Sequence, residues 1–167
     1  MIACLDVDYR ATGGAVVACL VFEKWESAAA SNVYAAVLDQ VAEYESGAFY
    51  KRELPCLLAA LAKVKEPLDF ILVDSYVFLD NQRKAGMGAH LYEALNPKIP
   101  VIGIAKTYFV GTDEIAAPVK RGSSQNPLFV SAIGVETAWA ATKIQQMHGL
   151  NRLPTLLKEV DSLCRTL

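Results

Sequence analysis

The amino-terminal segment Ile2–Tyr9 constrains the fold of this chain more than any other stretch. It opens with four consecutive apolar residues and then carries two carboxylates, Asp6 and Asp8, two positions apart. A short, uninterrupted apolar run followed by turn residues is typical of a strand buried on both faces. Residues two apart in a strand project to the same face, so these two acids are expected to point the same way. The sequence therefore predicts a central strand that ends in acidic side chains.

Carboxylates at the end of a buried strand need compensation. Burying an unpaired charge is costly, and hard divalent cations such as Mg²⁺ prefer carboxylate oxygen atoms. Two interpretations of Asp6 and Asp8 remain open from this segment alone. They are ligands of a metal ion, or they are acids that reach solvent where the strand ends.

Two later apolar runs also end in a charged residue. Phe70–Val73 is followed by Asp74, and Pro100–Ala105 is followed by Lys106. Each run predicts another buried strand. Taken singly, Asp74 fits a turn as well as a ligand position, and Lys106 can meet a phosphate or simply reach solvent.

The rest of the chain predicts alternating strands and helices. A glycine pair at positions 13–14 closes a hairpin between Ile2–Tyr9 and a valine-rich strand at Ala15–Phe22. Apolar spacing and helix-terminating residues predict four helices and one further strand, and the stretch Gly111–Pro127 is expected to be mostly loop. The helices are Lys51–Val64, Ala85–Leu95, Gly134–His148 and Pro154–Leu163, and the strand is Leu128–Ala132.

The segment Ser31–Tyr44 is ambiguous. Its valines at positions 33, 37 and 41 recur every four residues, which favours a helix, whereas the alternation within 32–38 permits a strand. By periodicity alone we predict a helix here. The whole order suggests an α/β domain with a mixed sheet whose active groups gather at strand ends.

Two glutamates fall at the start of predicted helices. Glu53 opens the helix that begins near Lys51, and Glu136 lies in the first turn of the helix that begins near Gly134. The ordinary explanation is that a carboxylate interacts favourably with the helix dipole. Together with Asp6 and Asp74 they would also suit two-metal phosphodiester chemistry. Spacing alone does not decide between these, because the chain has 18 acidic residues.

Composition narrows the class of protein. A chain of 167 residues with 53% hydrophobic residues is expected to form one domain over residues 1–167. A net charge of −2 argues against a strongly basic nucleic-acid-binding surface but leaves room for a local basic groove. The four cysteines have no CxxC spacing, which fits free thiols in a reducing compartment. With no signal peptide and no membrane-length apolar stretch, we expect a cytoplasmic protein.

These residues resemble the endonuclease V family, which has a ribonuclease H-like fold with a mixed central sheet flanked by helices. The matching segments occur in the family's order across nearly the whole chain. They are Leu5–Tyr9, Gly47–Leu61, Leu72–Asp74, His90, Ile102–Lys106 and Asn126–Phe129. The family fold would make Ser31–Val41 a third strand, against the helix that periodicity favours.

The resemblance implies a function for several residues. Asp6, Glu53 and Asp74 correspond to the family's metal-binding catalytic acids, Lys106 matches a lysine near the scissile phosphate, and Glu136 stands in for a late metal-site residue. The implied reaction is Mg²⁺-dependent cleavage of DNA on the 3′ side of deoxyinosine, in repair of deaminated purines. Mn²⁺ is the alternative metal, and inosine-containing RNA is another substrate of the family.

Further residues are assigned to nucleic-acid binding. Tyr44 keeps the aromatic ring of the family's wedge tyrosine, and Arg52 and Gly103 lie within matching segments. Lys120 and Arg121 belong to a flexible basic loop. They could line a backbone-tracking groove or form part of a scattered solvated surface.

The chain also departs from the family pattern. Ser75-Tyr76-Val77 stands where the family has a glycine-rich turn, Asp80–Lys84 replaces a more basic segment, and no Gly-His pair follows Phe129. Three functions therefore remain open. The leading one is a Mg²⁺-dependent endodeoxyribonuclease, and the others are a nuclease for inosine-containing or structured RNA and a catalytically inactive nucleic-acid-binding module of the same fold.

Overall fold

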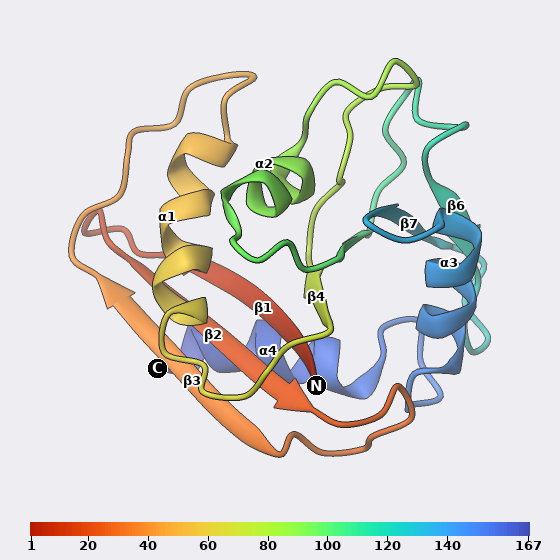
Figure 1. Cartoon of the computed structure of the whole chain (residues 1–167), viewed down its shortest axis with the longest axis horizontal. Coiled ribbons are helices and arrows are strands. Elements are labelled where there is room, and N and C mark those ends of the chain that lie inside the picture. Colours follow the sequence, from red (N-terminus) through yellow and green to blue (C-terminus); the bar gives the residue numbers. More distant parts are fainter.

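The computed structural model describes residues 1–167 and contains one seven-stranded mixed sheet with the order β3-β2-β1-β4-β5-β7-β6 (Figure 1). The strands are β1 Ile2–Tyr9, β2 Ala15–Phe22, β3 Asn32–Leu38, β4 Phe70–Val73, β5 Val101–Ala105, β6 Ala117–Val119 and β7 Leu128–Ile133. The helices are α1 Tyr50–Leu61, α2 Met87–Ala94, α3 Thr137–Gln146 and α4 Thr155–Thr166. This is the α/β, ribonuclease H-like architecture expected from the sequence.

The centre of the sheet is parallel. β1 pairs with β4, and β4 with β5, all running in the same direction. The register places Leu5 beside Val73 and Val73 beside Gly103. The residues that follow these positions therefore meet at one edge of the sheet, where the carboxyl ends of parallel strands gather.

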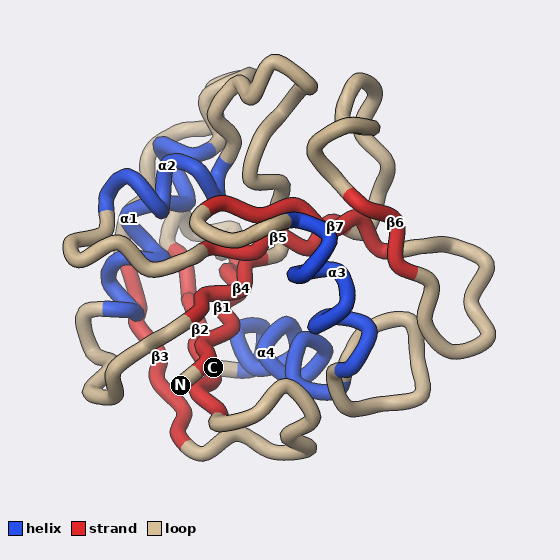
Figure 2. The backbone as a smooth tube through the Cα atoms, turned by 45° about the vertical axis from the view of Figure 1, so that its right-hand side comes forward, coloured by secondary structure: helices blue, strands red, loops and turns tan.

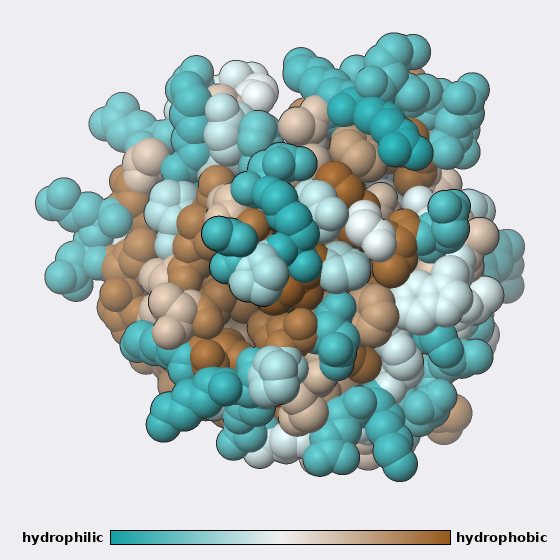
Figure 3. Space-filling view, viewed as in Figure 1, coloured by the Kyte–Doolittle hydropathy of each residue, from teal (hydrophilic) through white to brown (hydrophobic).

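Helices cover both faces of the sheet. α1 and α2 lie together on one face, and α3 and α4 lie on the other (Figures 1 and 2). In α4, Leu157, Val160 and Cys164 are buried against the strands because they recur at helical spacing. Apolar residues gather over the middle of the face that carries α1 and α2, surrounded by hydrophilic residues (Figure 3).

The opening hairpin predicted from the sequence is confirmed. β1 and β2 pair antiparallel from Ile2 opposite Phe22 to Tyr9 opposite Ala15. All eight residues of β2 are buried, as expected for a strand in the middle of a sheet. The four predicted helices are also present, with ends displaced by a few residues.

The helix that periodicity predicted at Ser31–Tyr44 is wrong, and the strand implied by the family resemblance is right. Residues Asn32–Leu38 form β3, which pairs with β2 at the edge of the sheet. A spacing of four is a multiple of the strand period of two, so Val33 and Val37 share a face in a strand as they do in a helix. Both are largely exposed, at 54% and 70%. This segment forms a strand because it pairs with β2, and the local spacing of its apolar residues carries no information about that pairing.

A second difference lies in the stretch Gly111–Pro127, predicted to be mostly loop. It contains the short strand β6, in which Ala117 lies opposite Val130 of β7. Pro118 in its middle argues against a strand in a sequence, because proline has no N–H to donate to a neighbouring strand. The strand is tolerated here because β6 lies at the edge of the sheet. No helix in the structure has both the length and the apolar character needed to cross a membrane.

Candidate active site

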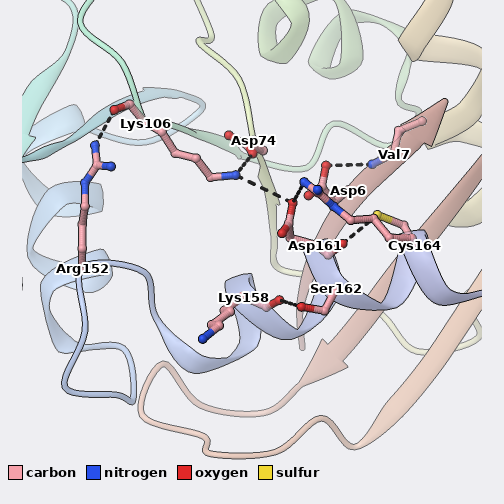
Figure 4. A network of polar contacts seen from close by, with 10 residues as sticks. Asp6, Val7, Asp74, Lys106, Arg152, Lys158, Asp161, Ser162 and Cys164 are labelled. Atoms are coloured by element: carbon pink, nitrogen blue, oxygen red, sulfur yellow. Dashed lines mark hydrogen bonds and ion pairs between the residues drawn. The ribbon is translucent and has the colours of Figure 1, made fainter.

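Two acids predicted from the sequence lie side by side. Asp6 follows Leu5, and Asp74 follows Val73, and these two apolar residues are partners in the register of β1 and β4. Lys106, which directly follows β5, lies beside them, with its Nζ 2.5 Å from Oδ2 of Asp74 (Figure 4). Asp6 lies within β1 rather than at its end, at the point where the pairing of β1 with β4 stops. Three neighbouring parallel strands thus bring together two carboxylates and one ammonium group.

A third carboxylate joins this cluster, and it is not among the candidate site residues that the sequence predicts. Asp161 of α4 has its Oδ1 3.9 Å from Nζ of Lys106, and its side chain points toward Asp6 and Asp74 (Figure 4). A signal was available: Asp161 follows the buried Leu157 by four residues and precedes the buried Cys164 by three. An acid on the buried face of an amphipathic helix is costly unless a cation or a hydrogen-bond donor compensates it, so such an acid is a candidate for a functional site.

Glu53 enters the site from the opposite face of the sheet. It lies in the first turn of α1 and is only 7% exposed. Burial, followed by the charges of Asp6 and Asp74, raises the pKa of its carboxyl to about 8. No ion pair neutralises Glu53, so its carboxylate would be a costly buried charge without a cation beside it.

The pKa of the Asp6 carboxyl is also raised. Burial raises its pKa to about 7, with further contributions from the charge of Asp74 and a hydrogen bond to Asp161. Burial would raise the pKa of Asp161 too, but hydrogen bonds from Arg165 and Asp6 lower it. The opposite directions of these two pKa shifts favour a proton on Asp6 over one on Asp161.

Two cations adjoin the cluster: Arg165, which pairs with Asp161 at 2.7 Å, and Lys106. Burial lowers the pKa of the Lys106 ammonium group, but the hydrogen bond and the charge of Asp74 outweigh burial and raise it. The lysine is therefore charged at neutral pH and faces Asp74 and Asp161 at once. Its main-chain carbonyl accepts a hydrogen bond from Arg152 (Figure 4).

The donor set fits a hard divalent cation by its chemistry. Asp6, Glu53, Asp74 and Asp161 offer only carboxylate oxygen atoms, and burial, followed by neighbouring acids, raises the pKa values of Asp6 and Glu53. The geometry of these carboxylates does not match their chemistry, since no group of three or more His, Cys, Asp or Glu side chains is arranged in this structure to hold a metal ion.

The structure does not bring Glu136 to this cluster. β7 runs antiparallel to β5, with Ile133 opposite Val101. Glu136, just after β7, therefore lies at the edge of the sheet where β5 begins, opposite the edge that carries Lys106. It is exposed at the start of α3, and we do not retain it as a metal-site residue.

Arg121 was assigned to nucleic-acid binding, and the structure gives it a different environment. Its side chain is 3% exposed, and its guanidinium group donates to the main-chain carbonyls of Met147, Gly149, Asn151 and Arg152. These donors hold the segment between α3 and α4, so Arg121 is not available to a phosphate. Its neighbour Lys120 is exposed.

Gly103 lies inside β5, with a structural reason to lack a side chain. A Cβ atom there would lie 2.3 Å from the main-chain oxygen of Ser75 and 3.0 Å from Oγ of Ser131. The absence of this atom lets the chain after Asp74 cross closely over β5. Ser131 Oγ then accepts a hydrogen bond of 2.9 Å from the amide of Val77, which holds the turn in place.

Three other residues that the sequence analysis names lie away from the carboxylates' ion pairs, each in its own environment. Tyr44, in the loop before α1, is 66% exposed. The guanidinium of Arg52 lies over the ring of Tyr9, with its carbon 4.0 Å from the ring centroid. The ring of His90 stacks on Tyr50 at 3.5 Å between centroids, so His90 packs against an aromatic ring.

Two hollows adjoin the cluster. The α1–α2 cleft adjoins Asp74 through Ser75, and its other walls are formed mainly by Phe49, Tyr50, Leu79, Gly86 and Met87. The β5–β7 pocket adjoins the cluster through Lys106 itself, and its other walls include Tyr108, Asn126, Pro127, Phe129 and Arg152. Ser75 and Lys106 thus connect the cluster to an apolar cleft and to a pocket that contains cations and aromatic rings.

The chain is similar in sequence to endonucleases V. The family model described as Endonuclease V matches residues 1–157. An endonuclease V of Streptomyces avermitilis is 30% identical over 83% of this chain and 72% of its own length. A second, from Streptomyces coelicolor, is 29% identical, and this chain spans 59% of it.

Solved structures show the same fold. The crystal structure of the Streptomyces avermitilis endonuclease V superposes with a TM-score of 0.84 at 26% identity, covering 99% of this chain and 79% of that one. A Ciona intestinalis endonuclease V, crystallised with a DNA that contains an inosine, gives a TM-score of 0.81 at 18% identity, covering 99% and 83%.

Proposed function

This chain belongs to the endonuclease V family, and we propose that it is a metal-dependent endonuclease that cleaves DNA on the 3′ side of deoxyinosine. Membership of this family indicates a nuclease. The observation that carries the proposal is the convergence of Asp6, Asp74 and Asp161 with Lys106 at one edge of the sheet. An ordered set of acids around one lysine suits phosphodiester hydrolysis.

Mg²⁺ is the proposed metal, with Mn²⁺ as the alternative, because every available donor is a carboxylate oxygen. Asp6, Asp74, Glu53 and Asp161 would hold it. When bound, such an ion activates a water molecule and stabilises the leaving oxygen. Asp6 and Glu53, whose pKa values are raised to about 7 and 8, would have to release their protons on binding it.

Lys106 has a separate role in this proposal. Its ammonium group is held by Asp74 and Asp161, and it would turn toward the scissile phosphate to neutralise the charge that develops in the transition state. Both members of the Lys106–Asp74 pair are about one-third exposed, so this pair is screened by water and costs little to open.

The α1–α2 cleft is the proposed pocket for the deaminated base. Its walls are mostly apolar and aromatic, and Ser75 connects it directly to Asp74. A planar base would pack against such walls. Exposed Tyr44 is the candidate for separating the strands beside the lesion. The four cysteines are all buried and free, which supports action in a reducing compartment such as the cytoplasm.

The test is cleavage of an oligonucleotide that contains one deoxyinosine, with Mg²⁺ and with chelator. An Asp74→Asn variant is the inactive control, and Asp69→Asn, an exposed acid that pairs with the amino terminus, is the matched control. We expect metal-dependent cutting that only Asp74→Asn abolishes. Full activity of Asp74→Asn would reject the proposed site.

The same assay separates the other functions of this fold. An RNA oligonucleotide with inosine at the same position, cut in preference to the DNA, would reassign the substrate. Binding of both nucleic acids without cutting of either would favour an inactive binding module.

A further inference from the structure

The β5–β7 pocket carries groups that the proposed reaction does not use. Tyr108, 46% exposed, and half-buried Phe129 lie in it with ring centroids 5.7 Å apart and planes at 56°. Lys106 and Arg152 line the same pocket. Aromatic faces beside cations form the combination that binds single-stranded nucleic acid, because bases stack on the rings and phosphates meet the cations.

The walls of this pocket are held in place without a ligand. The guanidinium of Arg152 donates to the main-chain carbonyl of Lys106 and, at 2.8 Å, to that of Pro127. One side chain thus ties the end of β5 to the segment just before β7. The carbonyl of Arg152, together with three neighbouring ones, is in turn held by buried Arg121.

The loop that carries Tyr108 is also fixed. The hydroxyl of Tyr76 donates to the carbonyl of Thr107 at 2.9 Å and accepts from the amide of Phe109 at 3.2 Å. The hydroxyl of Tyr108 donates to Asp113, with distances of 3.1 and 3.2 Å to its two carboxylate oxygens. The ring of Tyr108 is therefore preorganised, which lowers the entropic cost of binding a partner on it.

We propose that the β5–β7 pocket is a binding site for one nucleotide of the cleaved strand, on the 3′ side of the cleaved phosphate. It is the second nucleotide beyond the cleaved phosphate: its base stacks on Tyr108 and Phe129, while the cleaved phosphate itself faces Lys106. This proposal rests on the proposed function, in which the lesion base occupies the α1–α2 cleft. The cleft adjoins Asp74 and the pocket adjoins Lys106, so one strand crossing the carboxylates reaches both.

The test uses deoxyinosine strands shortened one nucleotide at a time from the 3′ end, and a second series shortened from the 5′ end. For the full-length chain, kcat/KM should fall about tenfold when the stacked nucleotide is removed from the 3′ side. Tyr108→Ala should show that loss already on the long strand and no further loss on the shortened one. Tyr108→Phe, which keeps the ring, should behave as the unaltered protein does.

Val110→Ala is the matched control, because Val110 lies in the same loop, is 81% exposed and does not line the pocket. It should retain the dependence on 3′ length. The proposal is overturned if Tyr108→Ala keeps the full 3′ length dependence, or if only shortening from the 5′ side matters to the unaltered protein.

A binding measurement separates this proposal from the proposed function. Fluorescence anisotropy of the same labelled strands in chelator reports affinity without cleavage. Absence of cleavage under all conditions would reject the proposed function, and the pocket would still stand if Tyr108→Ala weakened binding of long strands only. Equal affinity of Tyr108→Ala and the unaltered protein for every strand would reject the pocket.

Discussion

The ammonium group of Lys106 lies 2.5 Å from a carboxylate oxygen of Asp74, although the two residues are 32 positions apart in the chain. Each directly follows a strand, and the two strands are parallel neighbours. The pair compensates charge at a sheet edge where acids accumulate. It also keeps a cation next to the acids without committing it to a buried, permanent ion pair.

Replacement of Lys106 should therefore affect the reaction more than the fold. We expect Lys106→Met to lower kcat by about 100-fold or more, since one charged donor aimed at developing charge contributes on that scale. Thermal unfolding should change by only a few degrees, because both partners are partly exposed. Steady-state cleavage kinetics and a melting curve check this, with Lys98→Met, a lysine paired with exposed Glu93, as the control. Unchanged kcat in Lys106→Met would contradict the assignment.

Asp161→Asn tests the carboxylate that sequence analysis missed. Loss of a residue that supports a metal site lowers metal affinity or activity by about 10- to 100-fold. We expect Asp161→Asn to lose affinity for Mn²⁺ in that range by calorimetric titration, and to lose cleavage activity in the same range. Glu159→Gln, an exposed acid two residues earlier in α4, is the control. Equal metal affinity in the two variants would remove Asp161 from the site.

The metal-free protein should lose stability as the pH rises. The pKa values of Asp6 and Glu53 are raised from 3.8 and 4.5 to about 7 and 8 by burial and by neighbouring acids. At pH values between the unfolded-state and folded-state pKa of each group, the folded state binds more protons than the unfolded state. The free energy of unfolding therefore falls with increasing pH. The contribution is complete below about pH 4 and is lost as the pH passes through about 7 to 8.

Melting temperatures measured from pH 5 to pH 8.5 in chelator check this sign. The decline should be smaller in the variant Asp6→Asn/Glu53→Gln, which has no titrating group at these positions. Mg²⁺ should also reduce it, because the metal competes with the protons. A melting temperature of the unaltered protein that rises across this range, more steeply than that of the variant, would contradict the raised pKa values.

Arg121→Ala should destabilise the whole chain. It removes a buried guanidinium that donates to four main-chain carbonyls and leaves those acceptors without partners. Hydrogen bonds to charged groups contribute about 1.5–3 kcal/mol each and are not additive, so we expect a loss of about 3 kcal/mol. At about 2–4 °C per kcal/mol, the melting temperature should fall by about 10 °C.

Lys120→Ala is the matched control for this change, since the neighbouring lysine is exposed and its removal should leave the melting temperature within about a degree or two. Arg121→Lys should not restore stability, because one ammonium group cannot reproduce the fork of the guanidinium. A melting temperature of Arg121→Ala equal to that of Lys120→Ala would show that the clamp does not stabilise the fold.

The amino-acid sequence alone was sufficient for the elements that carry most of the site. Short apolar runs ending in Asp6, Asp74 and Lys106 predict buried strands with charged ends, and the apolar spacing of α1 and α4 predicts helices. These features depend on residues close together in the chain. The family resemblance added the third strand, β3.

Tertiary structure alone decided which distant groups meet. Asp161 joins the acids because α4 packs across β1 and β2, Glu136 is excluded because β7 runs antiparallel to β5, and Arg121 is buried because the segment after α3 folds over it. Strand direction and helix packing are set by contacts between residues tens of positions apart. Local periodicity carries no information about those contacts, so a charged residue's neighbours remain undetermined until the sheet is assembled.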